Sequence, residues 1–131
     1  MKKKIYVASP LSNPTKKGQE ANRIKAIHYC HQLEQQYRLH GEEVRCLAPH
    51  AYLPLLLEDD IPEERELALQ FGTALLATCE ELILVGDTLT AGMKGEYELA
   101  RQLGKPIYAT DKSLADTLQV TYRSRKGGGT W

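Results

Sequence analysis

The stretch Thr90-Ala91-Gly92-Met93-Lys94-Gly95-Glu96, which follows the apolar run Leu82-Ile83-Leu84-Val85, decides the fold of this chain. The apolar run is short and partly β-branched, which predicts a central strand covered on both faces. Gly86-Asp87 ends that strand, and a helical pattern extends from about Met93 to Leu103. These segments therefore predict a strand, a loop and a helix, the repeating unit of a parallel α/β sheet.

The predicted loop and the start of its helix carry candidate binding and catalytic groups. We expect Gly92 and Gly95 in the loop, where glycine can adopt positive φ or let a ligand approach the backbone. We expect Glu96 in the first helical turn, near the positive end of the helix dipole and above the edge of the sheet where α/β proteins bind ligands. An acid that only stabilises the dipole is the alternative interpretation of Glu96.

The rest of the chain repeats this alternation. Further strands are expected at 4–8, 43–47 and 106–109, and further helices at 18–40, 62–78 and about 113–118. The apolar face of the helix at 62–78 is expected to contain Leu67, Phe71, Ala74 and Leu75. The alternation predicts an α/β fold with a single-domain open parallel sheet of four to five strands, helices on both faces, and the flavodoxin-like or Rossmann-like order 2-1-3-4-5. We expect this domain to span residues 1–120 and residues 121–131 to form a flexible tail.

Composition excludes several classes of function. Lys and Arg together number 17, as do Asp and Glu, so the formal net charge is +0 and no overall field attracts nucleic acid. No apolar stretch is long enough to span a membrane, and we expect no membrane partner. Cys30, Cys46 and Cys79 are widely spaced and odd in number, which is typical of reduced thiols and predicts a cytoplasmic protein.

Hydroxyl groups and a histidine are predicted at the ligand-binding edge of the sheet. Ser9 follows the first strand, and Ser9, Thr90 and the backbone amides around Gly92 could hold a phosphate. Ordinary turn formation is the alternative for Ser9. His50 lies in the predicted loop 48–54 and is a candidate for substrate contact. His28, Cys30 and His31 offer too few ligands at suitable spacing for a metal, so we expect neither a metal nor an organic cofactor.

These features resemble the nucleoside 2-deoxyribosyltransferase superfamily, including its branch of nucleoside 5′-monophosphate N-glycosidases. The resemblance covers about residues 4–109 and rests on Ile5-Tyr6-Val7-Ala8, on Cys79-Glu80-Glu81-Leu82 and on the loop from Gly92 to Glu96. The segments 48–54 and 62–66 also look like an uncharacterised set of bacterial and phage proteins in this superfamily.

The resemblance implies roles for individual residues. Glu96 takes the place of the nucleophilic glutamate, followed by Ala100 and Lys105 at the spacing of the superfamily. It further implies that Tyr6 hydrogen-bonds the nucleophile and that Glu80, sixteen positions before Glu96, handles the base. Met93 packs on the ribose or base in this interpretation, whereas filling a gap in the core is the alternative. The alternative interpretation of Glu80 is that Glu80-Glu81 forms the solvated end of a helix.

Two positions depart from the pattern of the superfamily. Thr90 stands where the transferases have an aspartate that contacts the sugar 5′-hydroxyl and the monophosphate hydrolases have a serine that binds phosphate. A hydroxyl there accepts a phosphate dianion, which a carboxylate would repel. Glu80 replaces an aspartate and is one methylene longer, which alters the predicted contact with the base.

Three functions remain open from the sequence. The first is cleavage or transfer of the N-glycosidic bond of a (deoxy)nucleoside 5′-monophosphate by Glu96, with a small-molecule nucleotide or nucleoside as substrate. The second is a catalytically inactive nucleotide-binding or sensor module of the same fold. The third is a flavodoxin-like domain that binds a partner protein. The resemblance also implies a homodimer or larger homo-oligomer, because relatives complete their pockets with neighbouring subunits.

Overall fold

The computed structural model describes residues 2–10, 14–58 and 60–131, and shows one five-stranded sheet. The strand order is β2-β1-β3-β4-β5 and every pairing is parallel, which confirms the predicted order and class. The strands are β1 (Lys3–Ala8), β2 (Val44–Leu47), β3 (Glu81–Leu84), β4 (Ile107–Ala109) and β5 (Thr121–Tyr122). The helices are α1 (Lys16–Leu39), α2 (Pro49–Tyr52), the 3₁₀ helix η1 (Leu53–Leu55), α3 (Pro62–Thr78), α4 (Ala91–Gln102) and α5 (Lys112–Leu118).

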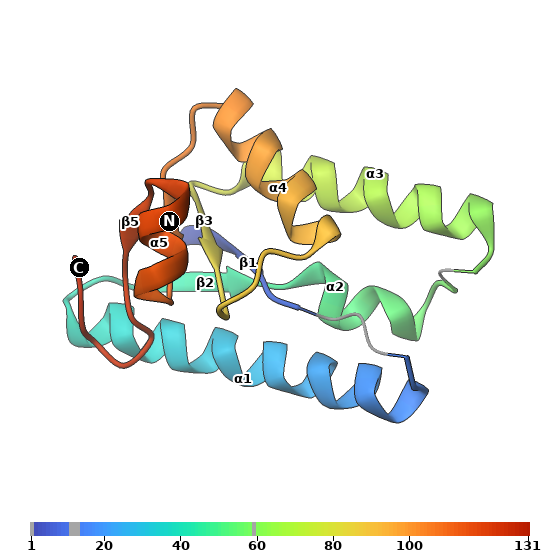
Figure 1. The fold of residues 1–131 in the computed structure, drawn as a ribbon, viewed down its shortest axis with the longest axis horizontal. Coiled ribbons are helices and arrows are strands. Elements are labelled where there is room, and N and C mark those ends of the chain that lie inside the picture. Colours follow the sequence, from blue (N-terminus) through green and yellow to red (C-terminus); the bar gives the residue numbers. More distant parts are fainter. Residues whose placement is uncertain (1, 11–13, 59) are drawn as a thin grey trace.

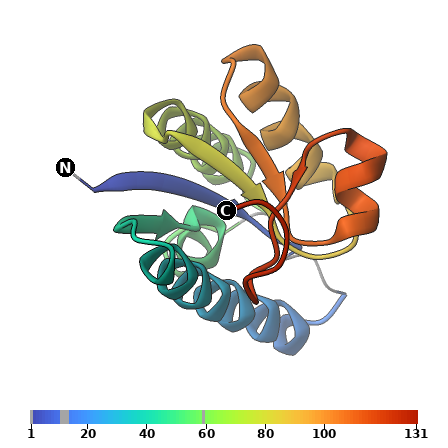
Figure 2. The ribbon, with the colours of Figure 1, turned by 90° about the vertical axis from the view of Figure 1, so that its left-hand side faces the viewer.

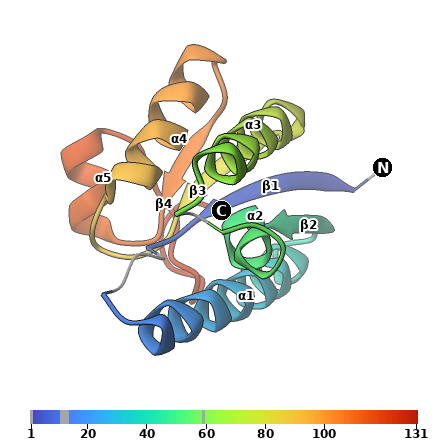
Figure 3. The same cartoon turned by 90° about the vertical axis from the view of Figure 1, so that its right-hand side faces the viewer.

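The sheet is the middle of three layers. Helix α1 and the short α2 cover one face, while α3, α4 and α5 cover the other (Figures 1 and 3). Alternating residues of β1 divide between the two cores: Ile5 and Val7 pack toward α1, and Tyr6 and Ala8 pack toward α3 and α4. Figure 2 shows the twist of the sheet between these two helical layers.

Strand β3 is the central strand that the sequence predicts. It pairs with β1 on one side, Leu82 opposite Tyr6, and with β4 on the other, Leu82 opposite Ile107. All four of its residues are buried. Gly86 follows with φ +103°, a conformation that L side chains rarely adopt, and directs the chain out of the sheet.

The segment after β2 differs from the prediction of a loop. Residues 49–52 form α2 and residues 53–55 form η1 instead. Pro49 occupies the first turn of α2, where its missing N–H has no intrahelical acceptor to lose. These short helices fix His50 against the sheet edge.

Helix α3 begins and ends as predicted, but of its predicted apolar face Leu75 alone packs on the core. Leu67 and Phe71 are 53% and 51% exposed. Leu76 is buried instead, and Gly72 lies over Tyr6 of β1. The sequence period is satisfied by either stripe of this apolar helix, so the period alone does not identify the buried one.

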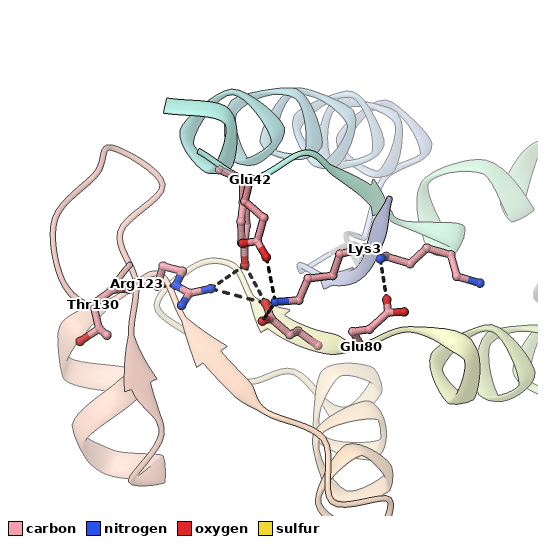
Figure 4. Close-up of polar contacts among 8 residues, drawn as sticks. Lys3, Glu42, Glu80, Arg123 and Thr130 are labelled. Carbon is pink, nitrogen blue, oxygen red and sulfur yellow. Dashed lines mark hydrogen bonds and ion pairs between the residues drawn. The ribbon is translucent and has the colours of Figure 1, made fainter. Parts of the chain in front are cut away.

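Residues 121–131, predicted as a flexible tail, add a strand and pack on the sheet. Arg123 is buried, its guanidinium carbon lies 3.7 Å from the centre of the Tyr108 ring, and Nη1 donates to the Tyr37 hydroxyl at 2.7 Å. Its charge faces buried Glu81, which also pairs with Lys3 (Figure 4). The domain therefore extends beyond the predicted boundary at residue 120.

Within residues 2–10, 14–58 and 60–131, no helix combines the length and apolar character that a membrane crossing requires.

Candidate functional site

The topology places one crevice of the sheet where ligands of α/β proteins bind. Strands β1 and β3 are neighbours, but the helices that follow them, α1 and α4, cover opposite faces. The connections after these two strands therefore diverge at the carboxyl edge, which is the topological switch point of the sheet. Ser9 follows β1, and Thr90 leads from β3 into α4. Residues 11–13 of the predicted loop after Ser9 lie outside the described residues.

Tyr6 and Glu96 meet on the α3 and α4 side of this crevice. Tyr6 is 2% exposed, and its hydroxyl hydrogen-bonds the Glu96 carboxylate. Burial raises the pKa of Glu96 to about 7, and the hydrogen bond from Tyr6 opposes that rise. Burial and the neighbouring carboxylate raise the pKa of Tyr6 above its ordinary value, so the tyrosine remains a neutral donor. The pair thus combines a carboxylate that titrates near neutrality with a fixed hydrogen-bond donor.

Gly72 of α3 contributes to this pair and was missed by the sequence prediction. A Cβ added at Gly72 would lie 3.3 Å from the Tyr6 hydroxyl oxygen, which is its nearest contact outside the helix. Glycine therefore leaves room for the phenol beneath the helix. A lone glycine inside a helix that is otherwise apolar is the signal that could have revealed this close approach.

Ser9 and His50 form a second pair at the same edge. The Ser9 Oγ and His50 Nε2 atoms are 3.0 Å apart, and Ser9 is 5% exposed. Burial lowers the pKa of His50 to about 4, so the ring is neutral at pH 7. His50 Nδ1 is shielded from solvent and meets no hydrogen-bond partner within the described part of the chain.

The start of α4 differs from the prediction. Thr90 is the N-cap, and its Oγ1 accepts the Met93 N–H at 3.3 Å. Gly92 and Gly95 are helical residues without positive φ rather than loop residues, and a Cβ at either would meet open space. The helix begins at Ala91 rather than near Met93, so Glu96 lies in its second turn and not its first.

Met93 and Thr90 therefore have structural roles besides any contact with a ligand. Met93 is 2% exposed and packs in the core between β3 and α4. The Thr90 oxygen is used as the helix cap, while its hydroxyl proton meets no acceptor among the described residues and could be donated to an anion.

Glu80 is not brought to this crevice. It precedes β3 at the amino edge of the sheet, and its Oε2 accepts the backbone N–H of Lys4 at 2.6 Å (Figure 4). Its own N–H donates to the Lys4 carbonyl at 2.8 Å, so Glu80 extends the ladder between β1 and β3. In this subunit the carboxylate lies at the opposite strand ends from Glu96 and cannot contact a base bound there.

The described residues contain no cluster of three or more His, Cys, Asp or Glu side chains suited to hold a metal ion. His28, Cys30 and His31 all lie on α1, where Cys30 faces the core.

Comparisons with known proteins agree with this fold. A family model described as "Domain of unknown function (DUF7768)" matches residues 3–110. A solved structure of 2-deoxyribosyltransferase from the psychrotolerant bacterium Bacillus psychrosaccharolyticus superposes with a TM-score of 0.61. That match covers 94% of this chain and 88% of the other, with 18% sequence identity. No curated protein matches the chain. The structural likeness shows a shared fold.

Proposed function

The chain belongs to the DUF7768 family, whose function is unknown, and from that premise we propose that it cleaves or transfers the N-glycosidic bond of a (deoxy)nucleoside 5′-monophosphate. The observation that carries the proposal is the partly buried Glu96 carboxylate beside Tyr6 at the switch point of the sheet. A carboxyl group whose pKa burial raises to near 7 costs the fold stability when it is charged, and groups with such perturbed pKa values concentrate in active sites. The solved structure of similar fold is a 2-deoxyribosyltransferase, which supports this class of reaction.

The reaction needs a carboxylate anion beneath the anomeric carbon. An oxygen of Glu96 forms a bond to C1′ as the bond from C1′ to the base nitrogen breaks, and the electron pair of that bond leaves with the base, which takes up a proton. Water or a second base then attacks C1′ and releases the Glu96 carboxylate. Tyr6 donates to one carboxylate oxygen and so orients the other toward the sugar.

The 5′-phosphate is proposed to lie at the start of α4. The Thr90 hydroxyl can donate its proton to a phosphate oxygen while its own oxygen caps the helix. The first turn of α4 also presents backbone N–H groups without intrahelical partners and the positive end of the dipole. An aspartate at this position would repel a phosphate dianion.

A homo-oligomer is proposed as the assembled form. Leu67 and Phe71, one helical turn apart on α3, have about half of their surface exposed, and Tyr52, Leu55 and Leu56 are exposed in the preceding segment. Exposed apolar side chains of this kind are candidates for an interface between copies of the chain. A second copy covering α3 would hold this helix, and with it Gly72, over Tyr6.

A nucleotide-binding module without turnover is the second candidate. It is favoured by the position of Glu80 at the opposite edge of the sheet, where this carboxylate cannot protonate a departing base. This candidate retains the phosphate contact of Thr90 and the buried pair of Tyr6 and Glu96.

The test is release of free base from a panel of nucleotides and nucleosides, followed chromatographically. Glu96→Gln keeps the shape of the side chain and removes its negative charge, so turnover should fall about a thousandfold or more. Glu98→Gln, a matched change at an exposed position of α4, should leave turnover unaltered. Binding of a nucleotide without base release would select the binding module, and full activity of Glu96→Gln would remove the nucleophile assignment.

A further inference from the structure

Two polar pairs flank the carboxyl end of β1 from opposite faces of the sheet. Tyr6 packs with α3 and α4, where it meets Glu96. Ser9 lies just beyond the end of the strand and contacts His50 of α2, a helix that packs with α1 on the other face. A nucleotide with its sugar over Glu96 therefore has a second hydrogen-bonding pair across the end of the same strand.

The contact between Ser9 and His50 allows either tautomer of the ring, and a count of hydrogen-bonding partners points to one of them. A buried serine hydroxyl has one proton to donate, and in the described part of the chain Nε2 of His50 is the acceptor within reach of Ser9. If Ser9 donates to Nε2, that nitrogen carries the lone pair and the ring proton is on Nδ1. Nδ1 is then a buried N–H donor with no acceptor among the described residues. Leaving a buried donor of this kind without an acceptor destabilises the ligand-free protein.

Resting on the function proposed above, we propose that His50 Nδ1–H donates a hydrogen bond to an acceptor atom of the departing base, and that Ser9 is the positioning residue that fixes this tautomer. The acceptor is a ring nitrogen or a carbonyl oxygen of the base. His50 thus supplies the base contact that Glu80, at the opposite edge, cannot make.

The chemistry of the leaving group explains why a neutral donor is useful here. When the glycosidic bond breaks, its electron pair spreads from the base nitrogen to the other acceptor atoms of the ring. A donor that already points at one of these atoms stabilises the charge that develops in the transition state. The low pKa of His50 agrees with this role, because the ring donates a hydrogen bond without carrying a charge of its own.

Access to Nδ1 requires movement around α2. The nitrogen has no solvent contact in the ligand-free structure, although part of the His50 surface remains exposed. A base reaches it when neighbouring groups shift, and the new hydrogen bond then removes the cost of the unpaired donor.

Two substitutions at His50 distinguish the roles of its two ring nitrogens. The amide nitrogen of asparagine overlays Nδ1, so His50→Asn keeps a donor toward the base and loses the contact with Ser9. The amide of glutamine reaches the Nε2 position, so His50→Gln keeps the contact with Ser9 and loses the donor. We expect His50→Gln to lower kcat/KM about tenfold to a hundredfold and His50→Asn to lower it less. Equal losses in both variants would overturn the assignment of Nδ1.

Changes to the base distinguish a contact with His50 from a purely structural role of this residue. The nucleotide cleaved fastest is compared with analogues in which one acceptor atom of the base at a time is replaced by C–H. With the parent protein, kcat/KM for one analogue should be about tenfold to a hundredfold lower than kcat/KM for the natural nucleotide. With His50→Gln, the same analogue and the natural nucleotide should have equal kcat/KM. If every analogue lowers kcat/KM by the same factor in His50→Gln as in the parent, His50 does not contact the base.

Nitrogen-15 NMR of the imidazole rings tests the tautomer without any turnover, with His50→Gln identifying the His50 signals. The ligand-free protein should show the proton on Nδ1, and Ser9→Ala should produce a mixture of tautomers. A proton on Nε2 in the parent overturns the inference even where base release is observed. If the parent neither cleaves nor binds any nucleotide, this inference and the proposed function fail together. Turnover with unchanged base discrimination in His50→Gln overturns this inference alone.

Discussion

Replacing Glu96 by glutamine should make the folded protein more stable above neutral pH while removing its activity. Burial holds the pKa of Glu96 at about 7, against 4.5 for an unperturbed glutamate. The two values differ by about 2.5, and each unit of pKa corresponds to about 1.36 kcal/mol, so the charged form costs the fold about 3 kcal/mol. Glutamine keeps an oxygen that accepts from Tyr6 and carries no charge that burial can penalise.

The sign of the effect follows from proton binding. Below pH 4.5 the carboxyl group is protonated in both the folded and the unfolded chain, so it confers no difference in stability between parent and variant. Between pH 4.5 and about 7 the folded chain holds more protons than the unfolded chain, and the unfolding free energy of the parent falls as the pH rises. Above pH 7 this loss is complete. Glu96→Gln has no carboxyl group at this position and does not lose this stability. Its unfolding free energy should therefore exceed that of the parent by an amount that grows from near zero at pH 4 to about 3 kcal/mol at pH 8.

Urea unfolding at pH 4, 6 and 8 measures this difference directly. The parent, Glu96→Gln and the exposed control Glu98→Gln are compared, so the titration of all other groups cancels between the proteins. Glu98→Gln should follow the parent at every pH. A constant difference between Glu96→Gln and the parent across this range, or a variant that loses stability at pH 8, would refute the reasoning that Glu96 is buried at a cost.

Further variants examine other parts of the structure. Thr90→Asp should make the protein prefer nucleosides over the matching monophosphates, because its charge repels phosphate; calorimetry with both ligands checks this, and an unchanged order of affinity would contradict the phosphate site. Gly72→Ala should lower turnover by moving the Tyr6 hydroxyl, since the added Cβ would lie 3.3 Å from its oxygen, and turnover equal to that of the parent would show that Tyr6 does not position Glu96. Phe71→Glu should shift the protein toward monomer in light scattering at micromolar concentration, and an unaltered mass would place the interface elsewhere. Glu81→Gln should lower the unfolding free energy by about 3 kcal/mol in urea titration, because it leaves the Arg123 charge buried without its partner; an effect below about 1 kcal/mol would show that this ion pair is dispensable.

The sequence predicts the sheet well because its strands are short apolar runs. The run from Leu82 to Val85 has no polar side chain to place in solvent, so a central position is the one environment that suits it. The alternation of strands and helices then determines the order, and the structure confirms it. The likeness to a solved 2-deoxyribosyltransferase, at 18% identity, shows the same fold as the one that the resemblance implies.

The site is predicted less completely because its contacts join distant segments. The sequence marks Ser9 and His50 separately, but their contact depends on α2, which was predicted as a loop. The approach of Gly72 to Tyr6 depends on which stripe of α3 faces the sheet, and the apolar pattern allows two. Glu80 follows the spacing of the superfamily, yet strand pairing assigns it to the amino edge of the sheet. The roles of Glu96 and Thr90 in chemistry stay predictions.

The packing of the C-terminal residues is not predictable from their local sequence. Arg123 lies in a stretch rich in arginine, lysine and glycine, a composition typical of solvated tails. Its guanidinium is instead stacked on Tyr108 and held by Tyr37 and Glu81. A buried cation of this kind depends on a partner in another strand, and the local sequence contains no trace of that partner.

This buried ion cluster bears on how fast the chain folds and unfolds. Tyr37 and Glu81 are 44 residues apart, and Arg123 is separated from them by 86 and 42 residues. Arg123 follows β5, the last strand of the chain, so the cluster is complete only when β5 has joined the sheet. Interactions absent from the transition state slow unfolding without speeding folding. If the cluster forms after the transition state, we expect its loss to speed unfolding of the native state and to leave the folding rate nearly unchanged.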